Sequence, residues 1–213
     1  MPHNWRFEDH QSEKGRWASA ELALLQRCRH FNVIALEEQI RVNSKCGVMG
    51  LVFPVYDMDV RQFINRRRGA HPEEYPEEHK VQIASGLWHG LKYLHSLSIV
   101  HRDIKPANIL INVLATIKNV VIADLGLAAD TANPSTSVGR RVQLTAHVRT
   151  WATGRYVAPE LLAFCKVEDV EDAALYDLSV DVWSAAVVTY EVVSLVRFCS
   201  STGDELTCIG GRL

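Results

Sequence analysis

The chain has 213 residues, of which 47% are hydrophobic and 23% are charged, proportions that are ordinary for a globular protein. Its formal net charge of −2 at pH 7 argues against nucleic acid as a main partner, because a surface that binds phosphates needs an excess of basic residues. The longest nearly apolar stretch, residues 185–196, is interrupted by Glu191 and is too short to span a bilayer. We therefore expect neither nucleic acid nor a membrane as a partner.

The cysteines and the N-terminal residues indicate the cellular compartment of the protein. The five cysteines form no CxxC pair, which favours free thiols in a reducing environment. The N-terminal stretch has no apolar signal core, and residues 1–17 are polar without a clear period. We expect an irregular N-terminal segment over 1–17 and a cytoplasmic or nuclear protein.

The first half of the remaining chain alternates helical and strand-like patterns. Apolar residues from Ala18 onward predict an amphipathic helix that ends near residues 30–32. A short apolar run over 33–36 predicts a strand, and a second strand is expected over 51–53 after a glycine-bracketed turn. Three consecutive arginines at 66–68 are typical of a solvated helix end, with a phosphate contact as the alternative.

The second half contains a longer helix and two more strands. Residues 71–78 are rich in proline and glutamate and predict a loop, after which apolar residues recur at helical spacing from Val81 to Leu94. Strands are expected over 109–111 and 120–123. The later expectations are a loop over 127–155, a helix that opens at 158–160, a buried apolar helix over 181–196, and a frayed, flexible tail over 199–213.

The most informative stretch is residues 101–108, His-Arg-Asp-Ile-Lys-Pro-Ala-Asn. An acid, a cation and an amide lie directly before an apolar strand, which predicts a loop that holds these side chains at one place. His-Arg-Asp with an asparagine five residues after the aspartate resembles the catalytic loop of eukaryotic protein kinases. The alternative is a solvated surface loop that matches by chance.

Two further motifs follow in the order found in kinases. Asp124-Leu125-Gly126 resembles the Asp-Phe-Gly motif, with leucine in place of phenylalanine. A plain turn is the alternative for this tripeptide taken alone. Residues 153–160, Thr-Gly-Arg-Tyr-Val-Ala-Pro-Glu, resemble the end of the kinase activation segment, in which Pro159 and Glu160 would be structural.

The resemblance implies the transfer of a phosphoryl group from ATP, with Mg²⁺ as the metal. Asp103 would orient the substrate hydroxyl or accept its proton, and Lys105 would lie against the γ-phosphate. Asn108 and Asp124 would ligate magnesium, and Thr153 would hydrogen-bond near the aspartate and the lysine. A lysine two places after the aspartate is typical of serine/threonine kinases.

The resemblance also implies a nucleotide pocket. Glu21 would be the ion-pair glutamate of the kinase αC helix, although an ordinary surface glutamate is the alternative. Adenine would bind backbone groups near Pro54 and Tyr56. The nucleotide-binding residues implied in this way are Glu21, Phe53, Pro54, Tyr56, Asp59, Lys105, Asn108, Leu110 and Asp124.

Asp181 and Arg102 suggest how the catalytic loop is supported and how its activity is controlled. Asp181 resembles the buried aspartate that braces the catalytic loop of kinases from below. Arg102 beside Asp103 suggests control by phosphorylation of the following loop. Thr145 and Thr150 are the candidate positions, with ordinary loop threonines as the alternative.

The resemblance covers residues 18–198 and implies an α+β, protein-kinase-like fold. Residues 18–56 would form an N-lobe remnant and hinge, with the αC helix and the last strands, and 57–198 the first part of a mainly helical C-lobe. Residues 57–63 favour the cyclin-dependent and MAP kinase group, although Val157 stands where that group has an arginine. No Gly-rich loop and strand lysine precede Glu21, so we expect the middle of a kinase domain, cut at both ends.

Two functions remain open at this stage. One is a serine/threonine kinase that is weakly active or inactive as this fragment, with a protein substrate, an upstream activating kinase and a regulatory subunit as partners. The other is a pseudokinase-like binding or regulatory module without catalysis. The preserved Asp103, Lys105, Asn108 and Asp124 favour the first function, and the missing phosphate-binding parts favour the second for the isolated chain.

Overall fold

A computed structural model describes most of the central part of the chain. The described residues are 21–41, 48–68, 75–114, 116–132, 142–143, 154–161 and 175–196. The expected segments 1–17 and 199–213, together with Thr145, Thr150 and Thr153, lie outside them.

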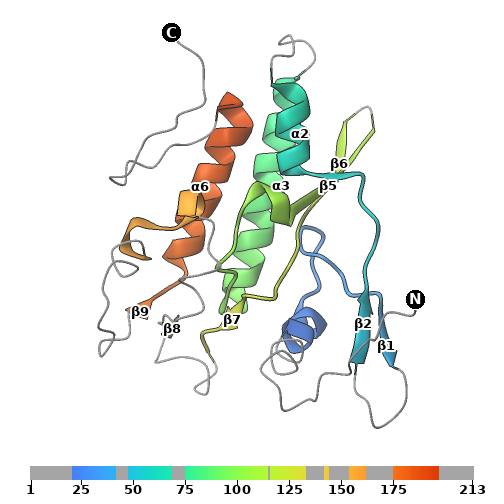
Figure 1. Cartoon of the computed structure of the whole chain (residues 1–213), viewed down its shortest axis with the longest axis vertical. Coiled ribbons are helices and arrows are strands. Elements are labelled where there is room, and N and C mark those ends of the chain that lie inside the picture. The colour runs from blue at the N-terminus through green and yellow to red at the C-terminus, as the bar shows by residue number, and fades with distance from the viewer. Residues whose placement is uncertain are drawn as a thin grey trace, which may run out of the picture.

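The described elements give the α+β content that the sequence predicts. A helix over 21–27 precedes the labelled elements of Figure 1. These are β1 (Glu38–Arg41), β2 (Val48–Val52), β3 (Met58–Asp59), α2 (Val60–Arg67), α3 (Glu77–Ser96), β4 (Ile99–Val100), η2 (Pro106–Asn108), β5 (Ile109–Val113), β6 (Ile117–Ile122), β7 (Ala129–Asp130), β8 (Val142–Gln143), η3 (Gly154–Tyr156), β9 (Leu175–Tyr176) and α6 (Ser179–Ser194).

The strands form small antiparallel sheets. One sheet has the order β3-β5-β6, and three strand pairs are formed by β1 and β2, β4 and β7, and β8 and β9. In the three-stranded sheet Ile109 lies opposite Ile122 and Met58 opposite Ile111. This register places residues 106–108, just before β5, beside residues 123–124, just after β6, so it brings two of the sequence motifs to the same edge.

The long helix α3 organises the core (Figure 1). It contacts β6, α6 and β4, and one face carries Ile83, Leu87, Leu91 and Leu94, which are each at most 1% exposed. This spacing is the helical period that the sequence shows. Gly90 lies on the same helix where the backbone of residue 32 approaches, and a Cβ there would meet the Asn32 carbonyl oxygen at 2.4 Å.

Several predicted boundaries are wrong. The first helix, expected to end near residues 30–32, ends at residue 27. The strand expected over 51–53 begins already at Val48, and the loop expected over 127–155 contains the short strands β7 and β8.

The strand expected over 33–36 is reduced to a single bridge between Val33 and Ile122, because the chain pairs briefly with the end of β6 through Ile34 N–H to Ile122 O (2.8 Å). The strand forms instead as β1, opposite β2. The loop expected over 71–78 ends earlier, since α3 begins at Glu77, and acidic residues in its first turn suit the helix dipole.

The helix α6 confirms the predicted apolar helix, but some of its side chains are less buried than expected. Ala185, Val188 and Val192 are fully buried, whereas Trp183 and Tyr190 remain 37% and 48% exposed. A left-handed residue, Leu195 with φ 56°, ends the helix. None of the described helices is long and apolar enough to cross a bilayer.

Candidate active site

The loop over 101–108 holds a compact group of polar side chains. His101, Asp103 and Asn108 are buried, and Lys105 is partly exposed. The Asp103 carboxylate oxygen Oδ2 accepts a hydrogen bond from Lys105 Nζ at 2.6 Å and one from Asn108 Nδ2 at 2.9 Å. The same amide nitrogen donates to the Asp103 carbonyl at 2.9 Å. A buried carboxylate that is held from one side in this way has a fixed orientation.

The imidazole of His101 connects this loop to the strand that precedes Asp124. Its Nδ1 accepts the backbone N–H of Asp103 (3.3 Å), so Nε2 carries the hydrogen in a neutral ring and donates to the Ala123 carbonyl (3.1 Å). The backbone N–H of Ala123 in turn donates to the Asn108 carbonyl (2.8 Å). Two sequence motifs that lie about twenty residues apart are thereby joined through direct hydrogen bonds.

Asp181 supports the loop from the first turn of α6. It is fully buried and accepts the backbone N–H groups of His101 (2.7 Å) and Arg102 (2.8 Å), together with His95 Nε2 (3.0 Å). Arg102 has a positive φ of 68°, which is uncommon for a residue with a side chain. The convergent N–H groups stabilise that conformation, and the predicted bracing role of Asp181 is confirmed.

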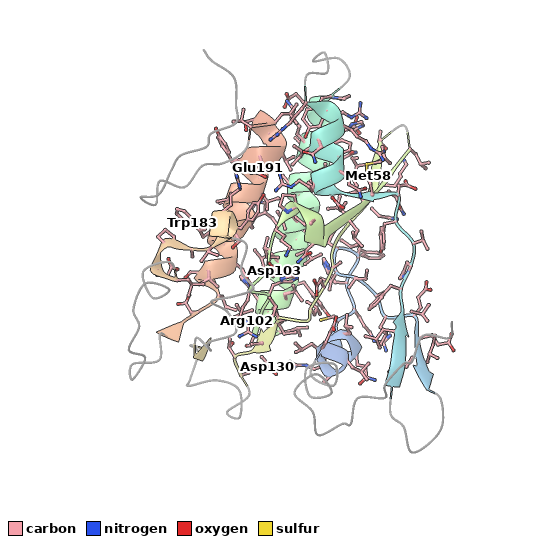
Figure 2. All side chains as sticks on the ribbon, viewed as in Figure 1. Met58, Arg102, Asp103, Asp130, Trp183 and Glu191 are labelled. Atoms are coloured by element: carbon pink, nitrogen blue, oxygen red, sulfur yellow. The ribbon has the colours of Figure 1, made fainter. Side chains whose placement is uncertain are left out.

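The arginine beside Asp103 contacts the segment that follows Asp124. Its Nε donates to the Leu127 carbonyl. Figure 2 shows Arg102 and Asp103 near the centre of the molecule, with Asp130 further down the same side and Glu191 higher up. Arg102 therefore contacts the start of the loop over 127–155, in which the sequence predicts control by phosphorylation.

Asp124 follows β6 with a positive φ of 65° and is exposed. Its Oδ1 accepts the backbone N–H of Gly126 at 3.2 Å, and Leu125 is buried in the core at 1% exposure. The leucine that replaces phenylalanine in the motif therefore packs in the core. Asp124 itself is exposed on a tight turn, so its carboxylate is available to solvent and ligands.

Glu21 approaches this turn from the helix over 21–27. A Cβ on Gly126 would lie 3.7 Å from the glutamate Oε2. Burial, followed by the carboxylate of Asp124, raises the pKa of Glu21 above its ordinary value. Among the described residues Glu21 forms no ion pair, so within that part of the chain its carboxylate faces another carboxylate rather than a cation.

The residues expected at the adenine pocket come from two segments: Phe53, Pro54 and Tyr56 lie between β2 and β3, and Leu110 lies in β5. Phe53, Tyr56 and Leu110 are partly buried against the main core, and Pro54 is also partly buried. Burial, with a contribution from the Glu37 carboxylate, raises the pKa of Tyr56, so the phenol keeps its proton at neutral pH. These four residues remain predicted nucleotide contacts.

Asp59 and Asp57 have structural partners. Asp59 caps the N-terminus of α2 by accepting the Gln62 N–H at 2.7 Å. Asp57 accepts the Val113 N–H at 2.7 Å and donates its own N–H to Asn112 Oδ1 at 3.0 Å. These two bonds tie Asp57 to β5, and no local sequence pattern predicts them. Asp59 remains a predicted nucleotide contact beside its capping role.

The sequence analysis does not predict a buried charge network that joins α2, η3 and α6. Glu191 in α6 is 0% exposed and pairs with Arg61 in α2 at 3.1 Å. Tyr156 in η3 receives a hydrogen bond from the arginine and donates its own to Glu191 at 2.9 Å. The available signal was Glu191 itself, because a charged residue inside an apolar helix requires a buried partner.

The oxygen atoms near the loop suit a hard divalent cation. Within the described residues no three His, Cys, Asp or Glu side chains gather as a metal cluster. Asn108 uses its amide nitrogen for two hydrogen bonds to Asp103, which leaves its amide oxygen as the ligand atom, and Asp124 offers a carboxylate. Magnesium is commonly held by one or two such protein oxygens together with water and phosphate oxygens, so these residues fit the predicted ion.

Comparisons with known proteins agree with the motifs. A family model described as the protein kinase domain matches residues 6–208. The chain is 35% identical to mitogen-activated protein kinase 7 of Arabidopsis thaliana over 176 residues, which cover 81% of this chain and 41% of the relative. It is 35% identical to cyclin-dependent kinase 1 of Encephalitozoon cuniculi over 179 residues, which cover 84% of this chain and 52% of the relative.

A solved structure agrees with the fold. The crystal structure of the yeast RNA Pol II CTD kinase CTDK-1 complex contains a chain that matches with a TM-score of 0.68 and 24% identity. The match covers 90% of this chain and 55% of that one. The chain thus spans about half the length of the known proteins it matches.

Proposed function

Because the chain belongs to the protein kinase domain family, we propose that it takes part in serine/threonine phosphorylation, with ATP as the phosphate donor and a protein hydroxyl as the acceptor. The observation that carries the proposal is the Asp103 carboxylate, which Lys105 and Asn108 hold at one edge of the β5–β6 sheet. The relatives of 35% identity are a mitogen-activated and a cyclin-dependent kinase, which supports the serine/threonine class.

The geometry supports a separate task for each side chain. In the described part of the chain, the hydrogen bonds to the Asp103 carboxylate reach Oδ2, which supports Oδ1 as the atom that would accept the hydrogen of a substrate hydroxyl. Lys105 brings a positive charge next to that carboxylate and can contact a transferring phosphoryl group at the same time. Phosphoryl transfer depends mainly on such positioning and charge.

Asn108 and Asp124 would hold Mg²⁺ through their side-chain oxygens. When bound, the ion supplies positive charge that neutralises the phosphate oxygens of ATP. The chain itself contributes the hydrogen bonds from His101 to Ala123 and from Ala123 to Asn108. These bonds fix the relative positions of the two segments that carry the ligands, before any nucleotide arrives.

We also propose a regulatory subunit and an upstream kinase as partners. The first is supported by the name of the cyclin-dependent relative and by the solved CTDK-1 chain, which is part of a complex. The second is supported by Arg102, which contacts the start of the loop after Asp124, and the predicted target positions Thr145 and Thr150 lie in that loop. A phosphate there would add an acceptor for the guanidinium.

Nucleotide binding and phosphate transfer by the purified chain test the proposal. Mg·ATP should raise the melting temperature, because a ligand that binds the native state at a hundred times its Kd stabilises it by about 2.7 kcal/mol. Asp124→Asn should abolish the shift caused by adding Mg²⁺ to ATP, and Asp103→Asn should abolish transfer of γ-labelled phosphate to a mixed protein substrate while leaving the shift intact.

Glu77→Gln is the matched control, since Glu77 is exposed at the far end of α3. It should behave like the unchanged chain in both assays. The absence of any shift at millimolar Mg·ATP would overturn the proposal and favour the binding or regulatory module that the sequence left open.

A further inference from the structure

An ion pair links the helix over 21–27 to the segment that follows Asp124. Arg27 Nη1 lies 2.5 Å from Asp130 Oδ2, across 103 positions of sequence. The second guanidinium nitrogen, Nη2, donates to the Leu97 carbonyl at 3.3 Å. One side chain thus contacts β7 and the end of α3 together. The sequence singled out neither residue, because an arginine and an aspartate so far apart give no local signal.

Asp130 lies in β7, which is bonded to the segment just before the loop over 101–108. In the β4–β7 pair it lies opposite Ile99, directly before the loop over 101–108. Its Oδ1 accepts the Ala132 N–H at 2.9 Å, and the neighbouring Thr131 N–H donates to Ser98 O at 2.8 Å. Since β7 begins at Ala129, five residues after Asp124 (129 − 124), the position of β7 limits where Asp124 can lie.

Helix 21–27 also approaches segment 124–130 at a second point, where the electrostatic interaction is repulsive rather than attractive. Glu21, at the other end of the described helix, approaches Asp124 and Gly126, where two carboxylates oppose each other. Two neighbouring negative charges repel each other. Helix 21–27 is therefore held to segment 124–130 at the Arg27 end and repelled from it at the Glu21 end.

We propose that Arg27 is a positioning residue: its ion pair with Asp130 holds segment 124–130 against helix 21–27 and thereby keeps Asp124 in place as a magnesium ligand. The second half of this statement rests on the proposed function. Arg27 itself touches neither nucleotide nor metal, and acts through β7. Its side chain is 43% exposed and that of Asp130 is 16% exposed, and an exposed pair of this kind contributes little to global stability. Its effect is local.

The experiment compares Arg27→Gln and Asp130→Asn with the exchanged pair Arg27→Asp/Asp130→Arg in the 213-residue chain. Hydrogen exchange of the backbone amides from Gly126 to Thr131 is measured without nucleotide. We expect faster exchange in both single variants, with the Thr131 amide as the most sensitive probe, and unchanged exchange at the α3 core. The exchanged pair should restore slow exchange, and 1 M salt should shrink the differences.

The second readout is the Mg²⁺ concentration needed for half of the ATP-dependent thermal shift. Each single variant should need about two- to fivefold more Mg²⁺, the range that corresponds to the energy of an exposed ion pair, while ATP alone binds as before. Arg27→Lys, which keeps the charge, should lie close to the unchanged chain. Glu77→Gln removes another exposed ion pair, with Lys80 on α3, and should change neither readout.

The outcomes separate this inference from the proposed function. If the unchanged chain shows no response to Mg·ATP, the proposed function fails, and hydrogen exchange alone decides whether Arg27 holds segment 124–130. Exchange at 126–131 that is identical in the unchanged chain and both single variants overturns the positioning role. A single variant that loses the whole fold also overturns it, because the pair would then be a determinant of global stability rather than of the site.

Discussion

The carboxylate of Asp181 accepts the backbone N–H of His101 at 2.7 Å, although 80 positions separate the two residues. The bond connects the first turn of α6 to the loop that carries Asp103. Because Asp181 also accepts the Arg102 N–H and pairs with His95, the positive φ of Arg102 is maintained by three groups converging on one buried carboxylate. The conformation of the loop therefore depends on a helix that is distant in sequence.

We predict that Asp181→Asn lowers the free energy of unfolding by about 1–3 kcal/mol, because the amide NH₂ would face backbone N–H donors that are left without an acceptor. Urea unfolding measures the change. Asp177→Asn is the control, since Asp177 is exposed and accepts the Ser179 N–H at the start of the same helix. An equal loss in both variants would contradict the special role of the buried carboxylate.

Gly90→Ala should destabilise the protein even though alanine is the better helix former. A Cβ at this position would lie 2.4 Å from the Asn32 carbonyl oxygen, which is backbone and can move little. Overpacking of this kind typically costs about 1–3 kcal/mol. At Gly50 a new Cβ would meet only the Ile40 side chain, at 3.8 Å, so Gly50→Ala is the comparison. Thermal unfolding of both variants measures the contrast, and a more stable Gly90→Ala protein would refute the close approach.

Arg61→Met should be among the more harmful single changes where α2, η3 and α6 meet. It removes the 3.1 Å partner of Glu191, whose side chain is 1% exposed, and breaking a buried ion pair from one side typically costs about 3–5 kcal/mol. Arg155, at 4.0 Å from the same carboxylate, should reduce this loss of stability. The double variant Arg61→Met/Glu191→Leu should recover part of it, and a double variant less stable than Arg61→Met would argue against an unpaired charge as the cause.

The pH dependence of stability should report the opposed carboxylates of Glu21 and Asp124. Burial and then Asp124 raise the pKa of Glu21 above its ordinary 4.5, so the folded protein binds the proton more tightly than the unfolded chain. This contribution is fully present below about pH 4.5 and is lost as the pH rises through the raised pKa. Urea titrations from pH 4 to 7.5 should show this decline in the unchanged chain and its absence in Glu21→Gln, which should be the more stable protein at pH 7. The same decline in both proteins would refute the assignment.

Local patterns predicted the elements that pack on the core. The period of Ile83, Leu87, Leu91 and Leu94 gave the long helix, and the apolar run before Asp124 gave a strand, because burial of one face produces these repeats in any such element. The ends were less well predicted. The run over 33–36 resembles a strand, yet Val33 alone forms a bridge, since the available partner edge of β6 ends there.

By itself the sequence determined the chemistry of the candidate site: the acid, cation and amide of residues 103–108, the aspartate at 124, and the family to which they belong. These are short-range facts, fixed by residue type and by a spacing of a few positions. The tertiary structure alone decided how the groups are held. The partners of Asp181, Glu191 and Arg27 lie 35 to 130 positions away, and a buried or paired charge finds its partner through the packing of helices and strands, which no local pattern specifies.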